Sequence, residues 1–122
     1  MQNPSTLSPL LSFKGEKKEA GLIDKSYQYT LKHLNNAINI GVLCKEIGTS
    51  QSTLNRTFQA VMGITTAHAL TKFKILLALD MLSDGVSVKL VAKHFGYSST
   101  PHFCRVFRSI MGISPKQYLK LT

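Results

Sequence analysis

The sequence is short of acidic residues and has no long apolar run, and each shortage excludes a class of protein. Only six Asp and Glu residues stand against fifteen Lys and Arg residues, which gives a net charge of +9. So basic a chain favours a polyanionic partner, either nucleic acid or an anionic membrane surface. No run of about 18 apolar residues occurs, so no segment is expected to span a membrane. No secretion signal is recognisable either, so we expect a cytoplasmic protein.

Cysteine and histidine are too few and too scattered to predict a metal site or a disulfide framework. Cys44 is expected on a buried helix face and Cys104 on the flank of another helix, so no bridge between them is expected. The four histidines show no metal-ligand spacing. The sequence has no glycine-rich phosphate loop, and no serine is paired by motif with a histidine and an acid. We therefore expect no metal, no cofactor and no enzymatic activity.

What the sequence does contain is a stretch, residues 96–115, that predicts a short amphipathic helix between two turns. Phe103, Phe107 and Ile110 recur at spacings of four and three, so they share one apolar face. Arg105 falls on the opposite face. A glycine then suits the left-handed residue after a helix, and a Ser-Pro pair suits the start of the next one. A helix that buries aromatic residues and exposes arginine is typical of helices that read DNA.

The same pattern occurs twice in the chain. Leu-Asn-Arg-Thr-Phe at residues 54–58 corresponds to Phe-Cys-Arg-Val-Phe at 103–107, and each copy is followed by Met-Gly-Ile and then Thr or Ser. Upstream, residues 39–48 correspond to 87–96, so the second copy carries one extra residue. The extra residue falls in the turn, where an insertion leaves the facing of the helices intact. Two tandem helix-turn-helix units are therefore predicted.

These motifs carry a resemblance to a known family. Residues 22–121 resemble the DNA-binding region of AraC/XylS-type bacterial transcription regulators, in which one long helix joins two helix-turn-helix subdomains. The family pattern of the second unit stands here as Val91-Ala92, Gly96-Tyr97-Ser98, Phe103, Arg105, Phe107, Gly112, Ser114 and Pro115. Three residues depart from the family pattern: Cys44 replaces a usual alanine, Thr66 a common proline, and Lys74 a common arginine of the joining helix.

Apolar periodicity and capping residues predict an all-α fold with about seven helices. Residues 1–20 lack a period and are expected to form a flexible lead or linker, with the DNA-binding domain over 21–122. The expected segments are a helix over about 22–34, a helix-turn-helix over about 39–62, a joining helix over about 66–82, a second helix-turn-helix over about 87–110 and a closing helix over 115–121. Asn39, Thr65 and Ser87 are expected as N-caps.

Polar side chains on the two predicted recognition helices are the candidates for DNA contact, because arginine and asparagine match base edges in the major groove. The base-reading candidates are Ser52, Asn55, Arg56, Thr100, Pro101, His102 and Arg105. The candidates for contact with phosphates are Gln59, Lys72, Lys89, Lys93 and Arg108. Each of these residues alone also fits an ordinary solvated surface. Their repeated position opposite an apolar stripe favours the DNA interpretation.

The resemblance implies a sequence-specific binder of double-stranded DNA that controls transcription through RNA polymerase, by activation more often than by repression. Two recognition helices would enter successive major grooves about 34 Å apart. Two alternatives stay open: a helical protein-interaction module, and a binder of RNA or of nucleic-acid shape.

The oligomeric state is expected to be monomeric, because both repeats lie in one chain and two half-sites need no second copy. Relatives often carry an effector-binding or dimerisation domain ahead of the DNA-binding part. About twenty residues precede the first predicted helix, which is too few for a ligand pocket. Either the chain acts without an effector, or a sensor domain was removed and residues 5–21 are its linker.

Overall fold

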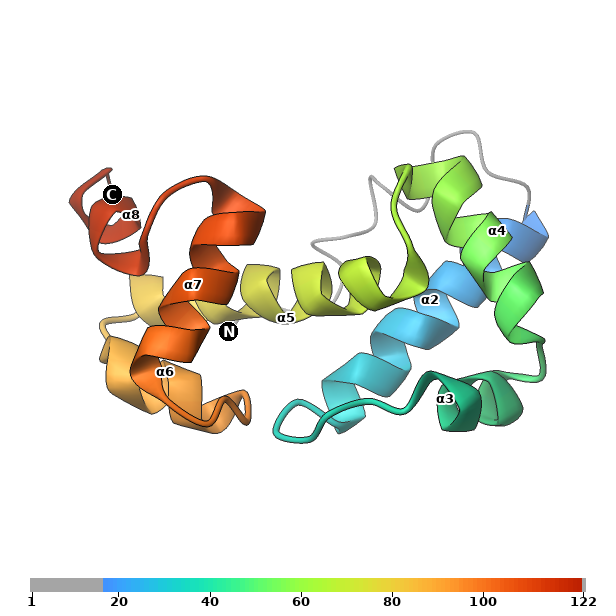
Figure 1. Ribbon diagram of the computed structural model, residues 1–122, viewed down its shortest axis with the longest axis horizontal. Coiled ribbons are helices and arrows are strands. Elements are labelled where there is room, and N and C mark those ends of the chain that lie inside the picture. Colours follow the sequence, from blue (N-terminus) through green and yellow to red (C-terminus); the bar gives the residue numbers. More distant parts are fainter. Residues whose placement is uncertain (1–16, 122) are drawn as a thin grey trace. The chain divides into compact units, whose positions relative to one another are not determined.

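The computed structural model describes residues 17–121, and the regular structure within that range is entirely helical (Figure 1). The helices in chain order are α2 (Lys17–Lys32), α3 (Ile40–Ile47), α4 (Gln51–Met62), α5 (Thr66–Ser83), α6 (Val88–His94), α7 (Thr100–Met111) and α8 (Pro115–Leu121). The expected all-α fold and the expected order of helices are confirmed. None of the helices in the described range is long and apolar enough to cross a lipid bilayer.

The chain divides into two compact units. The first holds α2, α3, α4 and the beginning of α5 up to Thr71. The second holds the loop His33–Ala37 together with the chain from Lys72 onward, which includes α6, α7 and α8. Each unit contains one of the two predicted helix-turn-helix repeats.

Helix α2 begins earlier than the sequence pattern predicted. It starts at Lys17 and ends at Lys32, whereas the expected helix ran over about 22–34. The apolar period that marks the buried face begins only at Leu22. Of the five helical residues before it, Lys17, Lys18, Glu19 and Ala20 are good helix formers that extend the helix without contributing to that period. The rest of the expected flexible lead, residues 1–16, lies outside the described residues.

Side-chain caps fix the starts of the other helices. The expected caps are confirmed: Asn39, Thr65 and Ser87 each accept a hydrogen bond from the backbone N–H three residues on, at 3.1, 3.2 and 3.2 Å. Ser50 and Ser99 make the same contact at the starts of α4 and α7, at 3.1 Å each. These bonds satisfy N–H groups that a helix leaves without an internal partner.

The core of the first unit lies between α2, α3 and α4, which contact one another pairwise. Its fully buried side chains include Ile23, Leu43, Leu54 and Phe58. Cys44 is buried beside them, as its position in the repeat predicted, and burial raises the pKa of its thiol. The thiol therefore stays protonated and packs as a small apolar group.

The core of the second unit is built around Phe103 and Phe107 of α7, both fully buried. Their rings lie 5.9 Å apart between centroids, and the Tyr97 ring meets Phe103 edge-on at 5.3 Å. Tyr118 of α8 contacts Phe107 in the same way at 6.1 Å. Aromatic pairs at these distances add to the stabilisation that burial alone provides. The aromatic stripe predicted from the sequence is therefore the centre of this core.

A lysine anchors the joining helix α5 to the loop that precedes α3. The Nζ atom of Lys74 in α5 donates a hydrogen bond to the backbone carbonyl of Asn36 at 2.9 Å. Partial burial lowers the pKa of Lys74 from its ordinary value. The hydrogen bond fixes the loop His33–Ala37 to α5 within the second unit.

Candidate nucleic-acid interface

The two helix-turn-helix repeats, α3–α4 and α6–α7, have turns that begin in the same way. Thr49 donates its backbone N–H to the carbonyl of Cys44 at 3.0 Å, and Tyr97 donates to the carbonyl of Ala92 at the same distance. The glycine before each donor is left-handed, with φ of 74° and 78° respectively. Because the turns match up to Tyr97 and the helices match from Ser99, the extra residue of the second repeat falls in the turn, as predicted.

The exposed face of α4 carries the four polar residues expected there, Ser52, Asn55, Arg56 and Gln59. The opposite face buries Leu54 and Phe58 completely, and no side-chain accessible surface remains on either. The buried stripe fixes the rotation of the helix, so the polar residues are held toward solvent.

The exposed face of α7 has the same organisation. Pro101, His102, Arg105 and Arg108 are exposed, while Thr100 in the first turn is half-buried. Proline is tolerated at this point because first-turn N–H groups have no helical partner. Arg105 occupies the position in α7 that Arg56 occupies in α4.

His102 is held at the start of α7 by two contacts. Its backbone N–H donates to the Oγ atom of the cap Ser99, at 3.1 Å. Its ring meets the Tyr97 ring edge-on, with centroids 5.4 Å apart. Burial of Tyr97 raises the pKa of its hydroxyl, so the phenol stays protonated. The turn therefore orients the imidazole, which remains exposed.

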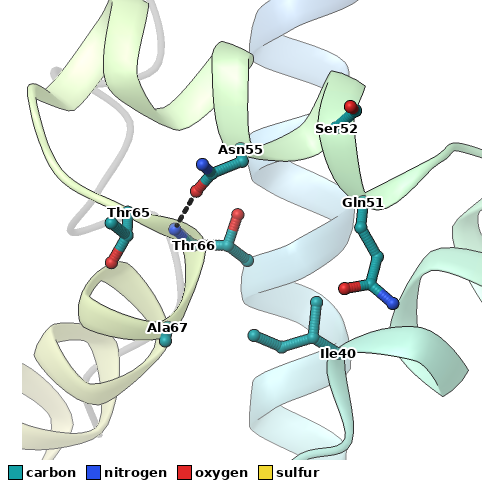
Figure 2. Close-up of a pocket in the computed structure, with 7 residues that line it drawn as sticks. All are labelled: Ile40, Gln51, Ser52, Asn55, Thr65, Thr66 and Ala67. Carbon is teal, nitrogen blue, oxygen red and sulfur yellow. Dashed lines mark hydrogen bonds between the residues drawn. The ribbon is translucent and has the colours of Figure 1, made fainter.

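Asn55 is exposed but already engaged within the protein. Its Oδ1 atom accepts a hydrogen bond from the backbone N–H of Thr66, the first residue of α5, at 3.1 Å (Figure 2). An adenine edge requires the carboxamide oxygen and nitrogen together. That bond uses one of the two lone pairs of Oδ1 and fixes the direction of the carboxamide, so Asn55 is less free to match an adenine edge than the sequence-based expectation assumed.

The basic residues expected to contact phosphates lie on several helices. Lys89 and Lys93 are exposed on α6, and Arg108 is exposed on α7. Lys72 of α5 is half-buried, so its position is the least suited of this group to reaching a phosphate. Within residues 17–121, no group of three or more His, Cys, Asp or Glu side chains is placed to hold a metal ion.

Two features of this surface went beyond the sequence-based predictions. Cys104 lies on the flank of α7, as expected, but it is half-buried and packs against the core of the second unit, a contact that was not predicted. The caps Ser50 and Ser99 were not singled out. Their identical position before each recognition helix, together with the capping preference of serine, was the signal that could have found them.

Comparisons with known proteins agree with this geometry. A family model described as a helix-turn-helix domain matches residues 43–121. The chain is similar to an HTH-type transcriptional regulator of Haemophilus influenzae, with 33% identity over 91 residues, which cover 74% of this chain and 30% of that protein. It is also similar to a response regulatory protein of Staphylococcus epidermidis, with 30% identity over 91 residues, which cover 75% and 36%. The chain thus spans about a third of the length of these relatives.

Solved structures share the fold. The C-terminal domain of AraT, a response regulator from Geobacillus stearothermophilus, matches with a TM-score of 0.68 and 26% identity over 83% of this chain and 85% of that one. The DNA-binding domain of AdpA, a global transcriptional factor solved in complex with a target DNA, matches with a TM-score of 0.66 and 25% identity over 81% and 90%. An AraC-type regulator from Chromobacterium violaceum, 17% identical with a TM-score of 0.75 over 86% and 95%, shares the fold.

Proposed function

The chain belongs to the AraC-type family of helix-turn-helix DNA-binding domains, and on that premise we propose that it regulates transcription by recognising particular double-stranded DNA sequences. One observation carries the specificity in this proposal. Arg56 and Arg105 project from equivalent positions of α4 and α7. Both helices begin after a serine cap, and both bury apolar side chains at equivalent positions. An arginine held at a fixed place on such a helix can donate two hydrogen bonds to O6 and N7 of guanine.

We divide the candidate side chains into a group that reads bases and a group that contacts phosphates. The base-reading group is Ser52, Arg56, Thr100, Pro101, His102 and Arg105, with Asn55 beside them on α4 and its Oδ1 atom bonded to Thr66. The phosphate-contacting group is Gln59, Lys72, Lys89, Lys93 and Arg108. The first group supplies discrimination between sequences, and the second supplies affinity that is common to all sequences.

On DNA, we propose that α4 and α7 enter successive major grooves about 34 Å apart. Both readers belong to one chain, so the binding unit is a monomer on an asymmetric site. Through RNA polymerase the bound protein would activate more often than repress, and its place of action would be the cytoplasm, where bacterial DNA lies. The DNA complex of the AdpA domain supports double-stranded DNA as the ligand.

Selection of bound fragments from random duplex DNA tests this function. We expect a single enriched sequence with two clusters of preferred bases, one for each recognition helix. Unrelated duplex and RNA should compete only weakly with the enriched duplex. Recovery of random fragments at the background rate would refute specific recognition, and equal competition by RNA would point to a binder of shape or charge.

A further inference from the structure

The hydrogen bond between Asn55 and Thr66 joins the first recognition helix to the helix that follows it. Asn55 lies on the exposed face of α4, and its Oδ1 atom reaches the N–H of Thr66, eleven residues later, at 3.1 Å. Both residues line a shallow pocket of about 310 Å³ within the first unit (Figure 2). The contact is a direct polar connection between the polar face of α4 and the start of α5.

Thr66 needs an external acceptor because of its place in the helix. As the first residue of α5, its N–H has no partner in the helix backbone. The residue is 3% exposed, so loss of the Asn55 acceptor would leave a largely buried N–H group without its partner. The neighbouring cap, Thr65, already accepts from the N–H of His68 at 3.2 Å. Asn55 therefore accepts a hydrogen bond from an N–H group that the N-cap Thr65 leaves without an acceptor.

The second repeat provides an internal control for this pair. Pro115 occupies the position of Thr66, at the start of α8, and Cys104 occupies the position of Asn55. Proline has no backbone N–H, and cysteine offers no carboxamide acceptor. Donor and acceptor are thus present together in the first repeat and absent together in the second. This pairing indicates that the carboxamide of Asn55 is matched to the amide of Thr66.

We propose that Asn55 is a positioning residue of the first DNA reader. This role rests on the proposed function. Its bond to Thr66 fixes α4 against the start of α5 and so sets the direction in which Ser52 and Arg56 face DNA. Base discrimination by this unit then comes from Ser52 and Arg56, which lie on the same exposed face of α4 as Asn55.

The second repeat also suggests how to remove the need for the bond. Proline is favoured at the first position of a helix, where its fixed φ suits the turn. The hydroxyl of Thr66 is buried without a hydrogen-bond partner, so the change Thr66→Pro removes an unsatisfied polar group as well as the amide donor. In the Thr66→Pro variant, the carboxamide of Asn55 has no backbone N–H at residue 66 from which to accept a hydrogen bond.

The test is a double-mutant cycle of the parent, Asn55→Ala, Thr66→Pro and the combined variant, with thermal midpoints recorded for all four. Affinity for the selected duplex is measured at a temperature at which all four are folded, and base preference is measured by a repeat selection. We expect Asn55→Ala to weaken binding about 2- to 10-fold, the range of one neutral hydrogen bond. The ranking of preferred bases should stay as in the parent. In the Thr66→Pro background, Asn55→Ala should change affinity by less than about 2-fold.

Two results would overturn the positioning role. A changed preference at one base position, seen with Asn55→Ala in both backgrounds, would make Asn55 a base reader. A lower thermal midpoint with unchanged affinity would make it a cap that only stabilises the fold. Failure of the proposed function is distinguishable from both, because it would appear in the parent as the absence of any preferred duplex.

Discussion

At the scale of single residues, the two repeats use the same positions for the same purposes. Phe58 and Phe107 are both fully buried, and Arg56 and Arg105, two residues earlier, are both exposed. The alternation of apolar and polar faces was readable from the sequence, because helical spacing alone decides which residues share a face. The partner of Asn55 was not readable. Its bond depends on how closely α5 approaches α4, and that approach is a property of the folded unit.

Replacing the arginines tests the assignment of the base readers. Arg56→Ala and Arg105→Ala should each weaken binding to the selected site by about 1–3 kcal/mol, because each removes a proposed two-bond contact with guanine. Each should relax preference at a different cluster of bases. Fluorescence anisotropy with matched and mutated duplexes measures both effects. Lys93→Ala is the control and should weaken all duplexes about equally. Arginine variants that bind and discriminate like the parent would contradict the assignment.

Replacing the buried phenylalanines tests the packing of each core. Phe58→Ala and Phe107→Ala should each lower the free energy of unfolding by about 3–5 kcal/mol, since each leaves a large cavity. That loss is large against a domain stability of about 5–15 kcal/mol. Cys44→Ala, which removes only a sulfur atom from a buried site, is the control and should cost much less. Urea denaturation followed by circular dichroism gives these values. A larger loss for Cys44→Ala than for Phe58→Ala would show that the first core is misassigned.

At the scale of elements, helix boundaries were predictable wherever a capping residue marked them. α3 begins after the expected cap Asn39 and α6 after the expected cap Ser87, and α4 ends at Met62, where the first helix-turn-helix was expected to end, just before Gly63. The start of α2 was not predictable in this way, because no apolar period reaches back to Lys17. The one extra turn residue of the second repeat was visible in the sequence, because the helices on either side of it still align with those of the first repeat.

The two turn glycines offer a matched pair for a test at this scale. Gly48 and Gly96 are both left-handed, so alanine at either should cost about 1–2 kcal/mol in backbone strain. A Cβ atom at Gly48 would meet nothing within 4 Å, whereas one at Gly96 would overlap the backbone of Asn35, lying 2.7 Å from its carbonyl carbon. Gly96→Ala should therefore destabilise the protein clearly more than Gly48→Ala in denaturant unfolding. Equal losses of stability would show that the backbone of Asn35 can move away from the added Cβ atom without a free-energy cost.

At the scale of the whole molecule, charge and repetition together point to DNA. The excess of fifteen basic over six acidic residues provides an attraction to phosphates that is independent of sequence. In the proposed function, the two recognition helices provide a means of discrimination between sequences. Composition and repeats were sufficient to predict the fold and the candidate surface. They were not sufficient to predict which polar residues are engaged within the protein, as Asn55 is, or half-buried, as Thr100 and Lys72 are, because those states depend on tertiary packing.

The most direct test of the central claim is the affinity of the chain for its selected duplex, and for an unrelated duplex of equal length, over a range of salt concentrations. Each phosphate neutralised by a basic side chain should contribute about −0.9 to the slope of log K against log salt concentration. We predict a steep fall in affinity for both duplexes, with the selected duplex preferred at every salt concentration. An affinity that does not change with salt and does not distinguish the two duplexes would contradict the account.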